Sequence, residues 1–270
     1  MKFICPKCSF ALSLNDNGSA LCKNGHCYDK SKEGYYNLLL SNTASHGDNR
    51  EMVVARRNFL DTGAYLPLAR RVSELVRDNV DTHSSILDAG CGEGYYTDII
   101  ERALTESNKE CEVFGFDISK EAVRIAAKKN HNLSLAVASA YHMPFADAAF
   151  EVVINLFSPL ALEETVRVLK PHGKFIMAIP AEEHLYGLKS AIYDTPYKNT
   201  VSDPELKGLT LLSSEKISYT LELASSEQIC SLFMMTPYAY RTKKEDAERI
   251  RRLESLKTQV EFIVFTYEKD

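Results

Sequence analysis

Short apolar runs alternate with amphipathic stretches along the chain from residue 85 onward. Short apolar runs between turns predict strands, whereas apolar residues spaced three and four positions apart predict helices. Strands that alternate with helices are typical of βαβ units around a parallel sheet. The predicted strands lie at 85–89, 112–117, 133–138, 150–155 and 173–179. The predicted helices between them lie at 94–105, 119–130 and 161–170.

The two ends of the chain have different patterns. The stretches KISYTLELAS (216–225) and QVEFIVFTYEK (259–269) alternate apolar and polar residues, which predicts antiparallel strands that close the sheet. The N-terminal residues are rich in cysteines and turns, and the residues after them form a connector that turns helical. The sequence therefore predicts a small module at 1–35, a connector at 36–84 and an α/β domain at 85–270.

The composition narrows the class of protein. Of the 270 residues, 45% are hydrophobic and 26% are charged, as expected for a globular protein with a sizeable core. No apolar run approaches the roughly 18 residues of a membrane span, and the N-terminus has no apolar signal region, so we expect a cytoplasmic protein. The net charge of −5 argues against a uniformly basic face for nucleic acid. Any surface that binds RNA must therefore be a local patch.

The N-terminal stretch combines cysteines with a histidine at metal-ligand spacing. Two residues separate Cys5 from Cys8 and three separate Cys22 from His26, which suits tetrahedral zinc. With all four positions filled by protein the site is structural, and metal binding would fold a segment that is poor in apolar residues. Cys27 could replace His26 as the fourth ligand. The alternatives are a metal-free thiol cluster and a redox pair at Cys5 and Cys8, although such a pair normally begins a helix.

A strand, a carboxylate and three alternating glycines follow one another in SSILDAGCGEGYYT (84–97). Gly90, Gly92 and Gly94 allow the backbone to turn sharply and to approach a ligand closely. The spacing differs from the phosphate-binding pattern G-x-G-x-x-G, because Asp88 precedes the glycines, where it can accept hydrogen bonds from an ammonium group. Asp88 could instead be a helix cap.

Two further loops follow the next two predicted strands. Asp117 ends the first of them, where a carboxylate can accept hydrogen bonds from both hydroxyls of a ribose. Ser139 and Ala140 follow the second. Open α/β sheets bind ligands at the carboxyl ends of their strands, so the three loops together predict one nucleoside site. Taken singly, Asp117 could be a solvated strand end and Ser139 a turn residue.

In this order the loops resemble the S-adenosylmethionine site of class I methyltransferases. The stretch VLKPHGKFIMAIP (168–180) is similar to the turn before the fifth strand of those enzymes. The resemblance implies a Rossmann-like α/β fold with a mostly parallel sheet and an antiparallel closing strand. It also implies S-adenosyl-L-methionine as the cofactor.

Longer stretches resemble one family in particular. They are CPKC…CKNGHC, KEGYYNLLL, RRNFLDTGAY, LDAGCGEGYYT and FMMTPYAYR, and they occur in one order between about residues 3 and 267. This combination is similar to the RlmA (RrmA) family of 23S rRNA guanine-N1 methyltransferases. The resemblance implies methyl transfer to N1 of one guanine in a 23S rRNA hairpin, a zinc module that helps to recognise the hairpin, and a homodimer.

The same resemblance implies roles for individual residues. The structural zinc would be bound by Cys5, Cys8, Cys22 and His26. S-adenosylmethionine would be contacted by Tyr65, Gly94, Tyr95 and His184. The additional Cys27 departs from the family pattern, which leaves the fourth zinc ligand open.

Arginines in the connector are candidates for contacts with RNA phosphates, namely Arg56, Arg57, Arg70 and Arg71. A second basic group near the C-terminus is diluted by acidic neighbours and consists of Lys243, Lys244, Arg249, Arg251 and Arg252. The alternative for both groups is the solvated face of a helix.

The acceptor side of the reaction is predicted from INLFSPL (154–160), which ends the fourth strand. Asn155 and Ser158 are candidates for hydrogen bonds to the edge of a guanine turned out of its stack. His142 is a candidate proton acceptor, with a capped turn histidine as the alternative, and no general base is assigned. The candidates for stacking on the base or the cofactor are Tyr95, Tyr96 and Phe157, each of which could equally be a core residue.

Two other functions remain open at this point. One is a small-molecule methyltransferase in which the cysteine module is merely structural. The other is a non-catalytic RNA-binding protein that retains the fold.

Overall fold

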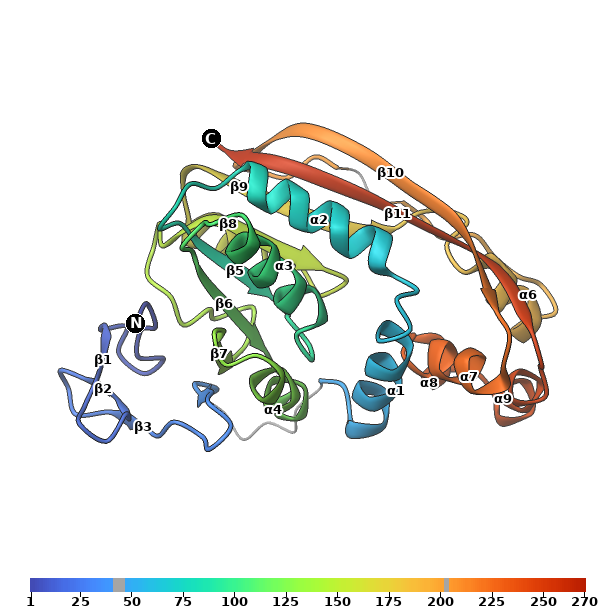
Figure 1. Ribbon diagram of the computed structural model, residues 1–270, viewed down its shortest axis with the longest axis horizontal. Coiled ribbons are helices and arrows are strands. Elements are labelled where there is room, and N and C mark those ends of the chain that lie inside the picture. The colour runs from blue at the N-terminus through green and yellow to red at the C-terminus, as the bar shows by residue number, and fades with distance from the viewer. Residues whose placement is uncertain (41–46, 202–203) are drawn as a thin grey trace.

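The computed structural model describes residues 1–40, 47–201 and 204–270. In these ranges the chain forms a small sheet of three strands and a large sheet of eight (Figure 1). The small sheet has the order β1-β2-β3, with bounds Leu12–Leu14, Ala20–Cys22 and Cys27–Tyr28. Among the described residues, no helix combines the length and the apolar character needed to cross a membrane.

The large sheet has the order β10-β11-β9-β8-β5-β6-β7-β4. Its strands from β9 to β4 run parallel to one another. β11 is antiparallel to both of its neighbours, so it separates β9 from the edge strand β10. The strands are β4 (Tyr36–Asn37), β5 (Ser85–Ala89), β6 (Glu112–Asp117), β7 (Ser134–Val137), β8 (Phe150–Leu156), β9 (Leu169–Pro180), β10 (Leu209–Leu223) and β11 (Leu256–Lys269).

Helices connect the parallel strands and cover the sheet (Figure 1). They are α1 (Arg50–Leu60), α2 (Leu66–Asp78), α3 (Tyr95–Glu106), α4 (Lys120–Lys129), α5 (Leu162–Val168), α6 (Tyr186–Ile192), α7 (Ser226–Met234), α8 (Tyr238–Arg241) and α9 (Lys244–Arg251). The predicted α/β fold with a mostly parallel sheet and an antiparallel strand near one edge is confirmed.

Two predicted boundaries differ most from the structure: β10 begins at Leu209 rather than at 216, and the helix predicted at 161–170 is too long. The helix predicted at 161–170 ends at Val168, and β9 begins at Leu169 rather than at 173. Pro171 favours this boundary, because the helical region is disfavoured for the residue before a proline, here Lys170, and helices usually end at or before that residue. The Leu169 backbone is already extended, with ψ at 138°.

The two faces of the large sheet pack against different parts of the chain. One face is covered by α1, α2, α3 and α4, which bury residues such as Val72 and Ile100. The opposite face packs against α5 and against the N-terminal module, whose Phe3, Cys5 and Leu12 belong to the same apolar cluster as the sheet residue Phe114. The module therefore shares a core with the large domain, at the end of the molecule away from α7 and α9 (Figure 1).

Phe3 is the main apolar contact between the module and the large sheet. It is 2% exposed, and its ring lies 5.1 Å from that of Phe145 and 5.8 Å from that of Phe114. The backbone N–H of Ile4 donates a hydrogen bond to the carbonyl of Pro144, 2.8 Å away. Aromatic packing and backbone pairing together hold the module in one orientation.

We expect Phe3→Ala to lower the free energy of unfolding by about 3 kcal/mol, because it removes a buried aromatic side chain and leaves a cavity. The matched control is Phe10→Ala in the same module, since Phe10 is 38% exposed; this change should cost less than about 1 kcal/mol. Equilibrium denaturation of the zinc-loaded protein measures both values. Equal losses for the two variants would contradict a shared core.

Candidate metal centre and active site

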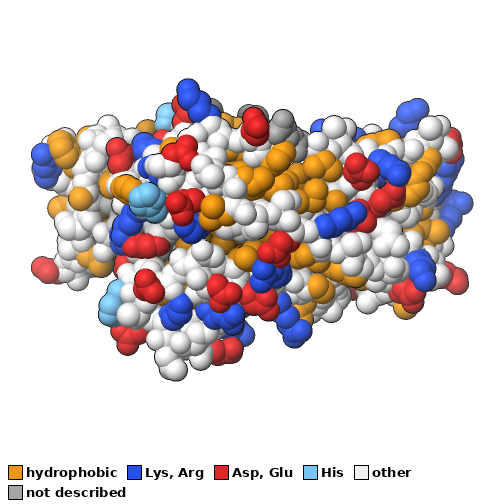
Figure 2. Space-filling model, turned by 90° about the horizontal axis from the view of Figure 1, so that it is seen from above, with side chains coloured by type: hydrophobic (Ala, Val, Ile, Leu, Met, Phe, Trp, Pro, Cys, Tyr) orange, Lys and Arg blue, Asp and Glu red, His pale blue; other side chains and the backbone are white. Residues whose placement is uncertain are grey.

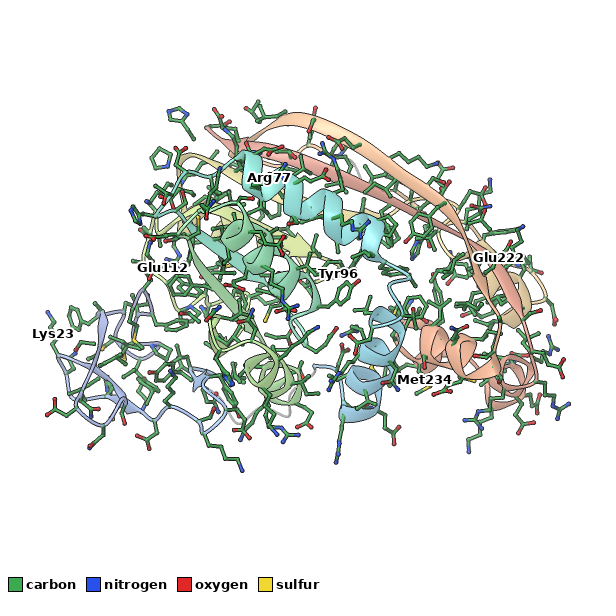
Figure 3. All side chains as sticks on the ribbon, viewed as in Figure 1. Lys23, Arg77, Tyr96, Glu112, Glu222 and Met234 are labelled. Carbon is green, nitrogen blue, oxygen red and sulfur yellow. The ribbon has the colours of Figure 1, made fainter. Side chains whose placement is uncertain are left out.

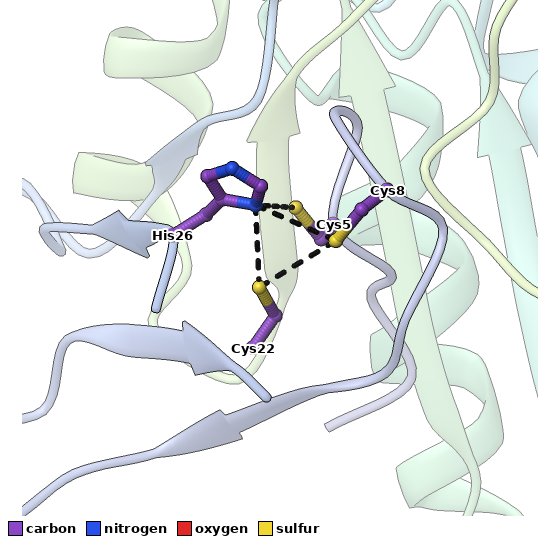
Figure 4. Close-up of side chains that lie close together, drawn as sticks. All are labelled: Cys5, Cys8, Cys22 and His26. Atoms are coloured by element: carbon purple, nitrogen blue, oxygen red, sulfur yellow. Dashed lines mark hydrogen bonds between the residues drawn. The ribbon is translucent and has the colours of Figure 1, made fainter. Parts of the chain in front are cut away.

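Three thiols and one imidazole converge in the N-terminal module (Figure 4). The ligand atoms of Cys5, Cys8, Cys22 and His26 all lie within 4.8 Å of one another. His26 Nδ1 is 3.4 Å from each of the three sulfurs, and the sulfurs of Cys8 and Cys22 are 3.6 Å apart. A tetrahedral zinc ion with ordinary bond lengths requires S···S near 3.8 Å and S···N near 3.6 Å, each about as found here.

Two tight turns bring these ligands together. Ser9 N–H bonds to the carbonyl of Cys5 at 2.8 Å, which closes the first turn, and Cys22 N–H bonds to the carbonyl of His26 at 3.0 Å, which closes the second. Cys27 is exposed and lies outside the cluster, in which His26 is the fourth side chain beside the three cysteines. The donor set and its spacing fit a closed, structural zinc site.

Tyr28 supports the cluster from outside. Its hydroxyl lies 3.3 Å from Cys5 Sγ. Burial raises the pKa of the Cys5 thiol, but the hydrogen bond from Tyr28 and nearby backbone N–H groups outweigh this effect and lower that pKa to about 6. The thiolate, which is the form that binds metal, is therefore favoured at neutral pH.

The glycine loop connects β5 to α3 in a conformation that only small residues allow. Gly90 and Gly94 have φ of 89° and 79°. A Cβ on Gly94 would lie 2.8 Å from the Cβ of Ala126 on α4, and one on Gly90 would collide with the side chain of Ser158. The loop is thus held between α4 and the segment after β8.

Asp88 lies at the carboxyl end of β5, beneath this loop. It is 2% exposed, and its Oδ2 accepts a 2.6 Å hydrogen bond from the Thr97 hydroxyl. Burial raises the pKa of Asp88 to about 7, and the carboxylates of Asp117 and Glu93 add to the rise, while Thr97 opposes it. Asp88 is not the cap of α3, since Gly94 occupies that position. A buried carboxylate without a cationic partner suits a positively charged ligand.

Asp117 ends β6 beside the same loop. Its Oδ2 accepts a 3.0 Å hydrogen bond from the backbone N–H of Gly92, and its Oδ1 accepts one of 2.8 Å from that of Ser119. Each carboxylate oxygen has a further lone pair, so the group can still accept hydrogen bonds from ribose hydroxyls. Burial raises the pKa of Asp117, whereas these two backbone bonds lower it.

The loop after β7 is built as a turn. Ser139 Oγ accepts a hydrogen bond from the Tyr141 N–H at 3.2 Å, and the Ser139 carbonyl accepts one from the His142 N–H, also at 3.2 Å. His142 is exposed on this turn. The structure thus gives Ser139 the role of a turn residue, at the strand end expected for the nucleoside site.

Tyr65 and His184 meet although 119 residues separate them in sequence. Tyr65 begins α2, and His184 follows β9. The Tyr65 hydroxyl is 3.3 Å from His184 Nε2, and the Glu261 backbone N–H donates to His184 Nδ1 at 3.2 Å. Burial, with a smaller effect of the Lys189 charge, lowers the pKa of His184 to about 3, so the ring is neutral at physiological pH.

These contacts determine where the protons are. Because Nδ1 of the neutral His184 accepts a hydrogen bond, Nε2 carries the ring proton and donates it to the Tyr65 oxygen. The Tyr65 hydroxyl can then donate its own proton elsewhere, and within the described part of the chain its one hydrogen-bond partner is His184. A buried donor of this kind fits the carboxylate of a bound amino-acid group.

Aromatic side chains connect this pair to the glycine loop. The Tyr95 ring is 5.1 Å from that of Tyr96, which projects from the start of α3 (Figure 3). The Phe157 ring follows at 6.3 Å from Tyr96 and lies 5.2 Å from Phe262 on β11. Phe157 has φ of 62° and is 43% exposed. An exposed aromatic in a strained conformation is a common sign of a binding site.

Asn155 and Ser158 lie together at the end of β8. Asn155 Nδ2 donates to Ser158 Oγ at 2.9 Å, and Ser158 Oγ donates to the carbonyl of Ala89 at 2.7 Å. They border a cavity of about 220 Å³, whose other walls include Phe157 and Met177. The candidates for the acceptor side therefore line one cavity beside the glycine loop, whereas His142 lies on a separate turn.

The four candidate RNA-binding arginines differ in their surroundings. Arg57 and Arg70 are exposed, and Arg57 pairs with Asp61 at 3.4 Å on the surface of α1. Arg71 donates two hydrogen bonds of 2.7 Å to the carboxylate of Glu215 on β10. Its guanidinium is therefore already paired and less able to contact an RNA phosphate. Arg56 is paired with Asp48 and half-buried. Sequence reasoning assigned all four to one group, which the structure divides.

We expect the zinc content of the protein to depend on the four residues of the cluster and not on Cys27. Wild-type protein and the Cys27→Ser variant should each contain about one zinc per chain, because the exposed thiol is no ligand. Cys22→Ser should lose the metal and unfold the module, since four ligands are needed for a closed site. Elemental analysis of purified protein measures the ratio. Loss of zinc in Cys27→Ser with retention in a His26→Ala variant would reverse the assignment.

We expect the affinity for S-adenosylmethionine to fall below pH 7. Its ammonium and sulfonium charges favour ionised Asp88, and protonation of Asp88 near pH 7 removes that attraction, so binding should be about tenfold weaker at pH 6 than at pH 8. Asp88→Asn should bind weakly with less dependence on pH, and Glu106→Gln, an exposed change on α3, should behave like wild type. Calorimetric titration measures these affinities; a flat wild-type profile would contradict the role of Asp88.

Comparison with known proteins adds independent evidence. A methyltransferase domain model matches residues 81–235, and the zinc ribbon model described as RlmA, N-terminal, matches residues 3–43. The 23S rRNA (guanine(748)-N(1))-methyltransferase of Streptomyces fradiae is 34% identical over 70% of this chain and 66% of its own length. A putative 23S rRNA (guanine-N(1)-)-methyltransferase of Bacillus subtilis is 29% identical over 94% of this chain and 92% of its own length.

The two family models cover both parts of the structure. One matches the zinc cluster and its small sheet, and the other matches the glycine loop, Asp88 and Asp117. The geometry of the donor set fits zinc, and the strand-end carboxylates fit a cationic nucleoside cofactor. The chain therefore belongs to the RlmA family, as a class I methyltransferase that uses S-adenosylmethionine and has an N-terminal zinc ribbon.

Proposed function

We propose that the protein transfers a methyl group from S-adenosylmethionine to N1 of one guanine in a 23S rRNA hairpin. The relatives named for this reaction at 29–34% identity support the acceptor. The observation on which the proposal mainly rests is the docking of the zinc ribbon on the methyltransferase sheet through Phe3. A rigid appended module can read the shape of a folded RNA, which a strand-end site alone cannot do.

The cofactor supplies the electrophilic methyl group, so the main task of the protein is to align donor and acceptor. On the donor side, Asp88 attracts the ammonium group and Asp117 accepts hydrogen bonds from the ribose hydroxyls. The Tyr65 hydroxyl donates a hydrogen bond to the carboxylate of the cofactor. These assignments rest on the hydrogen bonds described above and on the burial of Asp88 and Tyr65.

On the acceptor side, Asn155 is the residue we assign to the guanine edge. Its amide nitrogen is directed by Ser158, and within the described chain no donor reaches its Oδ1. The N1–H and the exocyclic amino group of guanine are both donors, so this oxygen can hold the edge that carries the reacting nitrogen. The exposed ring of Phe157 offers a stacking surface for a base turned out of its helix.

The zinc ribbon offers a second contact for RNA. Phe10 is partly exposed at its surface, and the ammonium of Lys23, at the far end of the module in Figure 3, lies 3.4 Å from the centre of the Phe10 ring. An aromatic face next to a cation suits an unpaired base and its phosphate. On the face drawn in Figure 2, basic and acidic side chains are interspersed, which supports local RNA contacts rather than one broad basic surface.

A homodimer with the RNA bound between subunits forms part of the same proposal. The resemblance to the family supports it, and light scattering of the purified protein at several concentrations tests it.

The reaction is tested by mapping reverse-transcription stops on 23S rRNA from a strain that lacks this gene. A methyl group on N1 blocks base pairing, so we expect a stop at one guanine that appears only when the wild-type gene is present. Asn155→Ala should lower the methylation rate by about tenfold or more, the effect of losing a buried hydrogen bond to the substrate. His142→Ala, on its exposed turn, is the matched control and should retain the stop.

Identical stops with and without the gene would contradict the acceptor. In that case, methyl transfer to a panel of metabolites tests the small-molecule alternative. Cofactor binding without transfer to RNA or metabolite would instead favour a non-catalytic RNA-binding protein.

A further inference from the structure

Arg56 lies beside the cofactor loop rather than on the outer surface of its helix. It belongs to the middle of α1, and 26% of its side chain is exposed. Its guanidinium pairs with Asp48. A Cβ placed on Gly92 would lie 4.0 Å from Arg56 Nη1, and among the described residues no other atom beyond its two chain neighbours lies within 4 Å of it. The guanidinium thus faces the glycine loop.

The residues just before α1 rest on the loop that contains Asp117. The carbonyl of Asp48 accepts a 2.9 Å hydrogen bond from the Ser119 hydroxyl. Gly47 packs so closely that an added Cβ would lie 2.9 Å from Ile118 Cγ2. Asn49 then caps α1 by accepting a 3.0 Å hydrogen bond from the Met52 N–H. Residues 47–49 therefore form a strap, and this strap and Arg56 both border the ribose side of the site.

Arg56 is surrounded by carboxylates. Burial lowers its pKa, but Asp48, Glu93 and Asp117 outweigh this effect and raise it. Glu93 is 4% exposed; burial raises its pKa, and Arg56 and then Lys129 lower it. For Asp117, which also faces Asp88, burial and Asp48 raise the pKa, and Arg56 lowers it. The guanidinium is thus the cation that balances the carboxylates beside the ribose site.

We propose that Arg56, held by Asp48, is a positioning residue of the cofactor site, which supports the glycine loop at Gly92 and the neighbouring Asp117 carboxylate for binding of the cofactor ribose. This role replaces the phosphate contact predicted for Arg56 from sequence. It rests on the S-adenosylmethionine site and not on the RNA acceptor, so it can fail or hold independently of the guanine assignment. It also means that the connector between ribbon and sheet completes the cofactor pocket.

The test separates Arg56 from its neighbour Arg57, which is exposed on the same helix. The probe is 5′-methylthioadenosine, which has the ribose and adenine of the cofactor but no ammonium group, so Asp88 does not affect the result. Its affinity is measured calorimetrically on full-length zinc-loaded protein without RNA. We expect Arg56→Ala to weaken binding about tenfold at pH 6.5, Arg56→Lys to restore part of the affinity, and Arg57→Ala to have no effect.

The pH profile distinguishes positioning from a merely structural role. Without Arg56 the pKa of Asp117 rises, because an adjacent positive charge is lost. Because binding requires the ionised form of Asp117, the loss of affinity on acidification should begin at a higher pH in Arg56→Ala than in wild type. In an Asp117→Asn background, Arg56→Ala should cause little further loss, since the two residues act together.

Three results would overturn the proposal. The first is wild-type affinity and pH profile for Arg56→Ala, and the second is a full tenfold loss that persists in the Asp117→Asn background. The third is an Arg56→Ala variant that loses RNA binding while it keeps the affinity for methylthioadenosine. If Arg56→Ala does not fold, Asp48→Asn, which loosens the guanidinium without removing it, should produce the same shift in pH profile at smaller amplitude.

Discussion

A hydrogen bond from the Gly92 backbone to Asp117 closes the glycine loop onto the neighbouring strand, and the cofactor site depends on it. Two further bonds of 2.9 Å, from the N–H groups of Gly90 and Cys91 to the carbonyl of Phe116, run beside it. Because the loop follows β5 and Asp117 ends β6, these bonds determine the distance between the backbone of the loop and the carboxylate. The crowding of Gly94 against Ala126 then leaves the loop little room to move.

Closing the loop in this way brings several carboxylates into a buried space. Asp88, Glu93 and Asp117 all have raised pKa values, in each case mainly because burial disfavours the charged form. Such a site is costly for the free protein and favourable for a ligand with positive charge. The same electrostatics explain why the half-buried Arg56 lies beside these carboxylates and why a cationic methyl donor fits the pocket.

The zinc ribbon is stabilised by two different interactions. The metal cluster shapes the segment between Cys5 and His26, which has few apolar residues of its own. Phe3 then packs this segment onto the sheet face opposite α2 and α3, so that the ribbon and the cofactor loop approach the large sheet from different sides. A module attached in this manner can enlarge the RNA-binding surface without covering the cofactor site.

The sequence by itself determined the features that depend on short-range spacing. The alternating strands and helices, the glycine loop with Asp88, and the pairing of Cys5 with Cys8 all follow from residue types a few positions apart, whereas the choice between His26 and Cys27 as fourth zinc ligand did not. Tertiary structure decided the contacts that depend on long-range packing. Tyr65 contacts His184, 119 residues away in sequence, and Arg71 forms an ion pair with Glu215, 144 residues away. The adjacent arginines Arg56 and Arg57 show why short-range sequence cannot decide such contacts. On a helix, successive side chains point about 100° apart, and only the packing of α1 against the cofactor loop decides which of them faces carboxylates and which faces water.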